Sequence, residues 1–152
     1  VWADGARVTK AAGLSEGTSK GEIMVHPFAD GGTHITTSEK IAKYPNSPTF
    51  GGPSGLYIAP KNQIDELLES GATRADIEFR LGLEKGSLNG GNLIRVDVSN
   101  PFNKNLRLPD PATGNIHHRP GIGLTTGGLN EMVINSPIKN TYGVISQVIR
   151  GR

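Results

Sequence analysis

The side chains best suited to proton transfer in this sequence are four histidines, of which three stand out. His117 and His118 are adjacent and are followed by Arg119, while His34 lies in a run of β-branched residues. Imidazole titrates near neutral pH, so it can take or give a proton, whereas a guanidinium group stays charged. We therefore identify His34, His117 and His118 as candidate acid–base residues and Arg119 as a candidate phosphate ligand.

This combination fits one kind of reaction that needs no metal. Cleavage of RNA by its own 2′-hydroxyl requires a base, an acid for the leaving 5′ oxygen, and cations or hydroxyls around the phosphate. Two simpler interpretations stay open. The run from His117 to Pro120 is also typical of a solvated loop, and a single histidine on a strand is often a hydrogen-bonded structural residue.

A glycine-rich turn supplies candidate anion ligands. Residues 123–128 read Gly-Leu-Thr-Thr-Gly-Gly, which presents the hydroxyls of Thr125 and Thr126 on a flexible backbone. Exposed backbone N–H groups and hydroxyls of this kind can bind phosphate. The run matches neither a P-loop nor a dinucleotide fingerprint, and a tight hairpin turn explains it equally well.

Glu131 and Tyr57 suggest a second chemistry. Glu131 is the only acid after Asp110 and precedes an apolar strand. Such a carboxylate can act as a general base, or it can orient a ribose hydroxyl in an NAD-consuming transferase, with Tyr57 as the aromatic partner. The alternative is an acid at an exposed strand end. Because residues 101–152 carry six basic and two acidic groups, we add Lys104 and Arg107, with Tyr57, as candidate substrate-binding residues.

The amino-acid composition excludes several kinds of chemistry and structure. The chain has 152 residues, no cysteine, 21 glycines and 10 prolines, and a formal net charge of +2. Its length predicts one domain. The lack of cysteine excludes disulfides and thiolate chemistry, and no histidine spacing typical of zinc is present, so we expect neither a metal nor another cofactor. No apolar run approaches the roughly 20 residues of a membrane helix, so we expect no stable membrane insertion.

Several elements must position these residues. We expect a flexible arm over residues 1–20 and a single domain over residues 21–152. Alternation and β-branched content predict strands at 22–26, 33–37, 55–59, 93–98, 131–134 and 143–149. Helices are expected at 38–44, 62–70 and 74–81, capped by Thr37 or Ser38, by Asn62 and by Thr73, and the last of them is expected to turn Phe79 inward. The proline- and glycine-rich loop 45–53 is typical of a cleft border, and the turn-rich stretch 100–128 is the expected place for chemistry.

This order is not a strict alternation of strands and helices. Strands dominate both ends and two helices lie in the middle, which predicts an α+β domain with a small, mostly antiparallel sheet packed on one helical layer.

A further run of residues resembles a known family. It comprises Leu106 to Pro109, Gly121, Leu124 to Glu131, and Val133 with Ile134, together with Gly55 to Tyr57 upstream. These motifs are similar to the C-terminal ends of filamentous-haemagglutinin-like proteins of contact-dependent growth inhibition systems, over residues 50–135. The family motif carries over to Thr125, Thr126 and Glu131.

That resemblance implies a toxin module at the end of a large secreted, cell-surface protein. The module is delivered into the cytoplasm of a target cell and paired with a cognate immunity protein, and a chain that begins at Val1 fits a segment of a longer polypeptide. Many such toxins are ribonucleases acting on tRNA, built on a barnase-like or RelE-like sheet, and a host translation factor is a further partner to consider. The sequence lacks the acids of metal-dependent nucleases.

We therefore expect a metal-independent ribonuclease toxin, with tRNA as the substrate. An NAD-dependent ADP-ribosyltransferase or NAD glycohydrolase is the alternative enzyme. A noncatalytic segment of an adhesin is the alternative outside enzymology.

Overall fold

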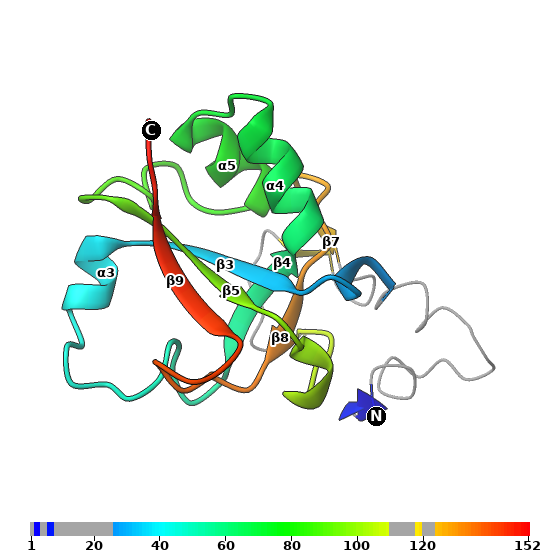
Figure 1. The fold of residues 1–152 in the computed structure, drawn as a ribbon. Helices are drawn as coiled ribbons and strands as arrows, with labels where there is room; N and C mark the ends of the chain where they lie inside the picture. Colours follow the sequence, from blue (N-terminus) through cyan, green and yellow to red (C-terminus); the bar gives the residue numbers. More distant parts are fainter. Residues whose placement is uncertain (1, 4–5, 8–25, 110–117, 120–123) are drawn as a thin grey trace.

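A five-stranded antiparallel sheet forms the centre of the molecule. The computed structural model describes residues 2–3, 6–7, 26–109, 118–119 and 124–152. The strands follow the order β8-β4-β3-β5-β9, and β3 is the middle strand (Figure 1). Their bounds are β3 (Gly32–Thr37), β4 (Leu56–Pro60), β5 (Leu93–Val98), β8 (Met132–Ile134) and β9 (Val144–Ile149).

Two helices cover one face of this sheet. They are α4 (Lys61–Glu69) and α5 (Arg74–Leu81), whereas the shorter α3 (Ser38–Ala42) extends from the end of β3 (Figure 1). The expected α+β class, with an antiparallel sheet and a helical layer, is confirmed. The other described elements are the 3₁₀ turns η2 (His26–Phe28) and η3 (Pro101–Asn103), and two short ribbons, β1 (Trp2–Ala3) with β2 (Ala6–Arg7) and β6 (His118–Arg119) with β7 (Leu124–Thr125).

Strand alternation divides the apolar residues between two cores, one on each face of the sheet. On the helical face, Ile35 and Leu93 pack with residues of α4 and α5, including Ile64 and Ile77. On the opposite face, the buried cluster consists of Phe28, Leu56, Ile58, Val98, Leu106, Met132 and Ile134. Because His34 and Thr36 alternate with Ile35 along β3, they lie on this second face.

The helix boundaries follow local hydrogen bonding. Thr37 caps α3 by accepting from the backbone N–H of Lys40, and Thr73 forms a capping box with Asp76 at the start of α5. The cap predicted at Asn62 is wrong. Pro60 holds the N-cap position of α4, and Asn62 instead donates to the carboxylate of Asp30 at 2.7 Å.

Two other expectations are corrected. The strand predicted at 22–26 is wrong at its last residue, because His26 begins the turn η2; residues 22–25 lie outside the described residues. Phe79, expected to turn inward, is 71% exposed. Most of the arm predicted at 1–20 also lies outside the described residues.

An ion network fastens α4 to the helical face of the sheet. The Arg95 guanidinium on β5 lies 2.8 Å from an oxygen of Asp65 on α4 and 2.9 Å from one of Asp97. Thr33 donates to Asp97 at 2.5 Å, and Lys61 pairs with Asp65 at 2.8 Å. The network therefore joins charged groups of α4 and β5 with a hydroxyl of β3.

Within the described part of the chain, no helix combines the length and the apolar character needed to span a membrane.

Candidate functional site

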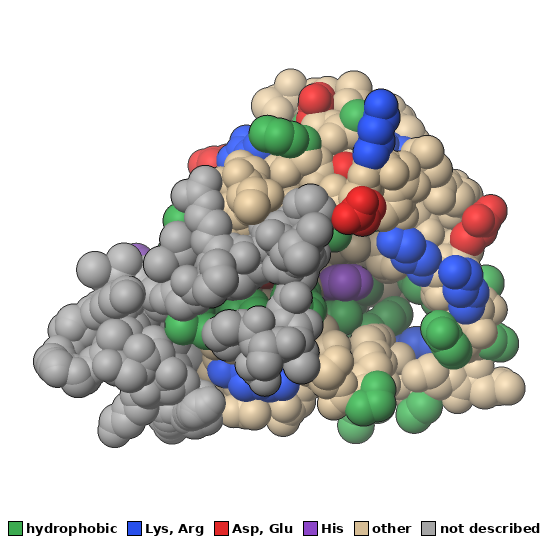
Figure 2. All heavy atoms as spheres, turned by 180° about the vertical axis from the view of Figure 1, so that it is seen from behind, with side chains coloured by type: hydrophobic (Ala, Val, Ile, Leu, Met, Phe, Trp, Pro, Cys, Tyr) green, Lys and Arg blue, Asp and Glu red, His purple; other side chains and the backbone are tan. Residues whose placement is uncertain are grey.

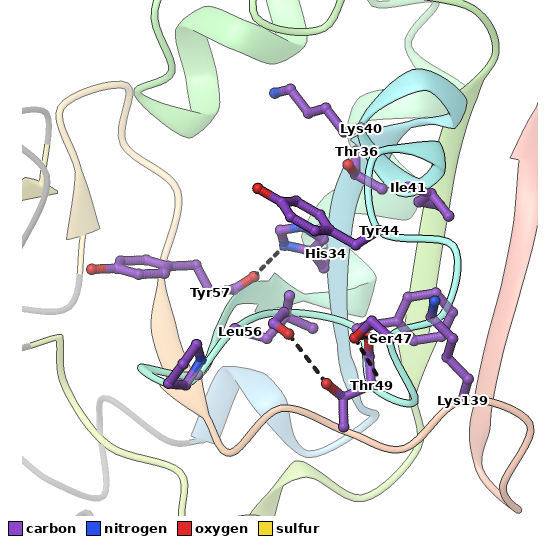
Figure 3. A pocket seen from close by; sticks show the side chains of 15 residues that line it. His34, Thr36, Lys40, Ile41, Tyr44, Ser47, Thr49, Leu56, Tyr57 and Lys139 are labelled. Carbon is purple, nitrogen blue, oxygen red and sulfur yellow. Dashed lines mark hydrogen bonds between the residues drawn. The ribbon is translucent and has the colours of Figure 1, made fainter.

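A cavity of about 590 Å³ opens on the face of the sheet opposite α4 and α5. Its floor is formed by β3 and β4, and its walls by α3, the loop 45–53 and the side chain of Lys139 (Figure 3). The loop that the sequence predicted as a cleft border does line this cavity. The cavity is lined by His34, Thr36, Lys40, Ile41, Tyr44, Ser47, Thr49, Phe50, Gly51, Gly52, Pro53, Gly55, Leu56, Tyr57 and Lys139.

His34 is the titratable group on the floor of this cavity. Its Nδ1 lies 2.8 Å from the backbone carbonyl oxygen of Tyr57. A carbonyl can only accept, so Nδ1 carries the proton, and in the neutral ring Nε2 keeps its lone pair. The hydrogen bond therefore selects one tautomer and fixes the ring plane at the same time.

The surroundings of His34 keep the ring neutral. Burial lowers the pKa of His34, the hydrogen bond to the Tyr57 carbonyl opposes this effect, and the positive charge of Lys40 lowers the pKa further. The net result is a pKa below the ordinary value of 6.5. At neutral pH the ring is thus a base, and no described residue hydrogen-bonds to its Nε2 atom.

Positive charge and hydroxyl groups surround this imidazole. Lys40 and Lys139 lie on opposite sides of the cavity, and Thr36, Tyr44, Ser47 and Thr49 supply hydroxyls (Figure 3). No carboxylate is among the described residues that line it. Figure 2 shows this face, with a histidine side chain set in a hollow, lysine or arginine side chains along one border and an acidic side chain above the histidine. Such a cavity favours an anionic ligand.

The outer wall is held by a neighbouring segment of the chain. Phe50 N–H donates to the carbonyl of Pro137 at 2.9 Å, and Lys139 N–H donates to the carbonyl of Pro48 at 2.8 Å. These bonds bring the Lys139 ammonium over the Phe50 ring, 5.4 Å from its centroid. Two segments almost ninety residues apart in sequence thereby form one wall.

The glycine-rich turn predicted to bind phosphate packs against the end of α5 and not at the His34 cavity. Thr125 is fully buried, and its hydroxyl donates to the carbonyl of Arg80 at 2.6 Å and accepts from Leu129 N–H. Gly127 lies so close to the end of α5 that a Cβ there would come within 2.1 Å of the Phe79 carbonyl oxygen. Thr126 is exposed on the same turn. Neither threonine lines the His34 cavity.

The remaining predicted residues divide between the cavity and its surroundings. Tyr57 contributes its backbone carbonyl, while its ring points away from His34 (Figure 3). Glu131 is 7% exposed, so it is buried and not at an exposed strand end. Lys104 follows η3 and its ammonium lies 3.5 Å from the Asn103 side-chain oxygen, whereas Arg107 donates to the backbone carbonyl of Asn105 at 2.9 Å.

The His-His-Arg motif is only partly described. His117 lies outside the described residues. The backbones of His118 and Arg119 form β6, in register with Thr125 and Leu124 of β7, and their side chains are not among those described. The described residues thus do not converge on a single cavity as expected, and the acid–base roles of His117 and His118 stay predictions.

Sequence reasoning did not single out Lys40, Tyr44 or Lys139. Their signals are weak because each residue type is common on surfaces. Tyr44, at 71% exposed, is a large aromatic side chain at the mouth of the cavity. The proline-rich loop that follows Tyr44 was the one available indication of a cleft here.

Among the described residues, no group of three or more histidine, aspartate or glutamate side chains is arranged to hold a metal ion. No model of a known protein family matches the sequence, and no curated protein matches it at a significant level.

Proposed function

We propose that this chain is a metal-independent ribonuclease and the toxin module of a contact-dependent growth inhibition system. The observation that carries the proposal is the state of His34. A neutral imidazole with its Nδ1 proton bonded to the Tyr57 carbonyl lies in a cavity bordered by two lysines and four hydroxyl side chains. A fixed base in a cationic cavity is what cleavage by the 2′-hydroxyl requires.

In the proposed reaction, Nε2 of His34 takes the proton of the ribose 2′-hydroxyl. The 2′ oxygen then attacks the adjacent phosphorus, and the bond between phosphorus and the 5′ oxygen breaks. The products are a 2′,3′-cyclic phosphate and a 5′-hydroxyl end. The leaving oxygen needs a proton, and we assign that role to the Lys40 ammonium or the Tyr44 hydroxyl, both of which belong to the described lining.

Lys40 also provides electrostatic stabilisation. Its positive charge lowers the pKa of the His34 ring, and its side chain lines the same cavity. Negative charge on the nonbridging phosphate oxygens increases in the transition state. A fixed cation therefore stabilises the transition state more than the ground state. The hydroxyls of Thr36 and Tyr44 can hold the ribose and the phosphate in place.

The biological setting is part of the same proposal. The five-stranded antiparallel sheet with one helical layer supports a small nuclease of the barnase or RelE kind. The motif resemblance supports a secreted, delivered toxin whose substrate is tRNA and whose producer makes an immunity protein that covers the cavity. An acidic immunity surface would complement Lys40 and Lys139.

The test uses the purified chain and total cellular RNA in excess chelator. We expect discrete RNA fragments that end in 2′,3′-cyclic phosphate. A synthetic RNA of a cleaved sequence should stay intact when the nucleotide before the scissile bond is 2′-deoxy. Intact RNA, or fragments with 3′-hydroxyl and 5′-phosphate ends, would contradict the proposal, because those ends arise from water attack.

One observation favours a second candidate, an NAD-consuming transferase or glycohydrolase. Tyr57 pairs with Val133 across β4 and β8, so Glu131, two residues away, lies on the same face of the sheet as Tyr57. This face is opposite to that of His34, so the two candidate activities use different residues. Release of nicotinamide from NAD by the chain, abolished in Glu131→Gln and kept in His34→Gln, would support this candidate. Unchanged NAD in the presence of cell extract would exclude it.

A further inference from the structure

A second cavity adjoins the one that contains His34. It has a volume of about 450 Å³, and it shares Ser47, Thr49 and the segment 51–53 with the first cavity. The two side chains that belong to the second cavity alone are Asn135 and Ser136, which follow β8. The two cavities thus border the same loop, with His34 in the lining of one and Asn135 in the lining of the other, and together we call them the groove.

The carboxamide of Asn135 is held in one orientation. Its side-chain oxygen accepts from Nη1 of Arg107 at 3.2 Å and from Nδ2 of Asn105 at 3.3 Å. With the oxygen bonded on that side, the Nδ2 group is directed away from Arg107. Asn135 is exposed, and no described residue accepts a hydrogen bond from its Nδ2 atom. The groove thus has a fixed donor that the protein does not itself use.

Arg107 is a positioning residue in this arrangement. Its guanidinium donates to the backbone carbonyl of Asn105 at 2.9 Å and to that of Ser54 at 3.3 Å, besides Asn135. These bonds connect the loop before β4 to the segment after β8. The sequence predicted Arg107 as a substrate ligand, and the structure shows both of its Nη groups bonded to protein oxygens.

We propose that the second cavity is a nucleotide subsite, in which the amide of Asn135 donates to an acceptor on the nucleotide next to the scissile step. This inference rests on the proposed ribonuclease function and names its substrate as an RNA that extends beyond the cleaved dinucleotide. Every base has ring or carbonyl acceptors at its edge, and an amide donor suits them. Ser136 donates to the Gly52 carbonyl at 2.5 Å and keeps lone pairs that can accept from the same nucleotide.

The experiment measures affinity for uncleavable RNA, so it does not depend on catalysis. The probes are 2′-O-methyl oligonucleotides, one a dinucleotide and the others extended by one nucleotide at the 5′ or the 3′ end, titrated into the full chain and followed by NMR. A subsite with one good hydrogen bond and added contacts is expected to tighten binding of one extended probe by roughly tenfold.

Two variants of Asn135 define the source of that gain. Asn135→Asp keeps an oxygen for Arg107 but has no donor, and Asn135→Ala removes the whole amide. Both are expected to abolish the tenfold gain and to leave the affinity for the dinucleotide unchanged. Arg107→Gln is expected to reduce the gain, because the amide is no longer fixed. Asn89→Ala, an exposed asparagine outside the groove, is the control and should bind like the wild type.

The outcomes separate the subsite from the nuclease. Equal affinity for all probes, or equal weakening of dinucleotide binding in Asn135→Asp, would overturn the subsite even where RNA is cleaved. A gain that depends on Asn135 would support the subsite. If total RNA nevertheless stayed intact, the nuclease proposal would fail, and the same gain would identify a site that binds RNA without cleaving it.

Discussion

The two faces of the central sheet carry charged and polar side chains that serve different ends. On the helical face, Arg95 is bonded to Asp65 and Asp97, so the charges neutralise one another and hold α4 in place. On the opposite face, His34 and Lys40 share a cavity in which no carboxylate is found among the described lining residues. Thr33 and His34, adjacent on β3, thus belong to a structural ion network on one face and to a cavity without described carboxylates on the other. A histidine of lowered pKa that lies in a cavity beside lysine side chains is a feature of functional sites, which points to a ligand.

The largest expected effect is the loss of activity when the base is removed. His34→Gln can still donate to the Tyr57 carbonyl but cannot take a proton, so RNA cleavage should fall by about 10²–10⁴-fold while the fold is kept. Cleavage kinetics and circular dichroism check the two parts of this prediction. His26→Gln, a change at an exposed histidine, is the matched control. Equal activity of the two variants would mean that the cavity face is not the catalytic one.

The next-largest expected effect is a loss of stability when the ion network on the helical face is broken. Arg95→Met leaves Asp97 and Asp65 without their shared cation, and removing one partner of a largely buried ion pair costs about 3–5 kcal/mol. We expect a loss of stability near the lower end of that range, because Asp65 is partly exposed, and little change in the catalytic constant of the molecules that stay folded. Denaturant unfolding measures the first quantity. A variant that unfolds like the wild type would show that the network contributes no stability.

A smaller effect is expected from the cation beside His34. Lys40→Met should reduce the rate by about 10²-fold, as the removal of one transition-state donor does, and it should raise the pKa of His34. Rates are measured at saturating RNA, and the imidazole is titrated by NMR. Lys43→Met changes an exposed lysine just after the same helix and should leave both values unchanged. A normal rate in Lys40→Met would show that groups other than Lys40 stabilise the negative charge on the phosphate.

The sequence predicts the local features of the fold better than it predicts the contacts that build the His34 cavity. Helix α5 was predictable because Thr73 and Asp76 form a local capping box, and β5 because its residues alternate. The cap at Asn62 was not, since Pro60 comes directly from β4 and Asn62 bonds instead to distant Asp30. His34 could be recognised as a candidate from its residue type. Its partners could not, because Lys139 reaches the cavity only through the pairing of Thr49 with Ile138.

The smallest expected effect is a difference in how the two faces respond to acid. The pKa of His34 is lowered in the folded state, so below 6.5 the unfolded chain binds more protons and stability falls as the pH falls. For Asp65, burial disfavours the charged form, but hydrogen bonds from Lys61 and Arg95 outweigh it and lower the pKa. Its stability contribution is present above 3.8 and is lost as the pH falls below that value.

Two variants distinguish the pH range in which His34 affects stability from the range in which Asp65 does. The decline in the free energy of unfolding just below pH 6.5 should be lost in His34→Gln, and the dependence below pH 3.8 should be reduced in Asp65→Asn. Denaturant titrations at a series of pH values provide the measurement. If His34→Gln kept the decline just below pH 6.5, another group would have to be responsible for it.

The pH dependence of single-turnover RNA cleavage, measured in chelator beside an NMR titration of His34, tests the base directly. If the unprotonated Nε2 atom takes the 2′-hydroxyl proton, the rate rises tenfold per pH unit on the acid side and levels off at the NMR pKa of His34, below 6.5. A rate that levels off at a different pH, or that keeps the same profile in His34→Gln, would contradict this account.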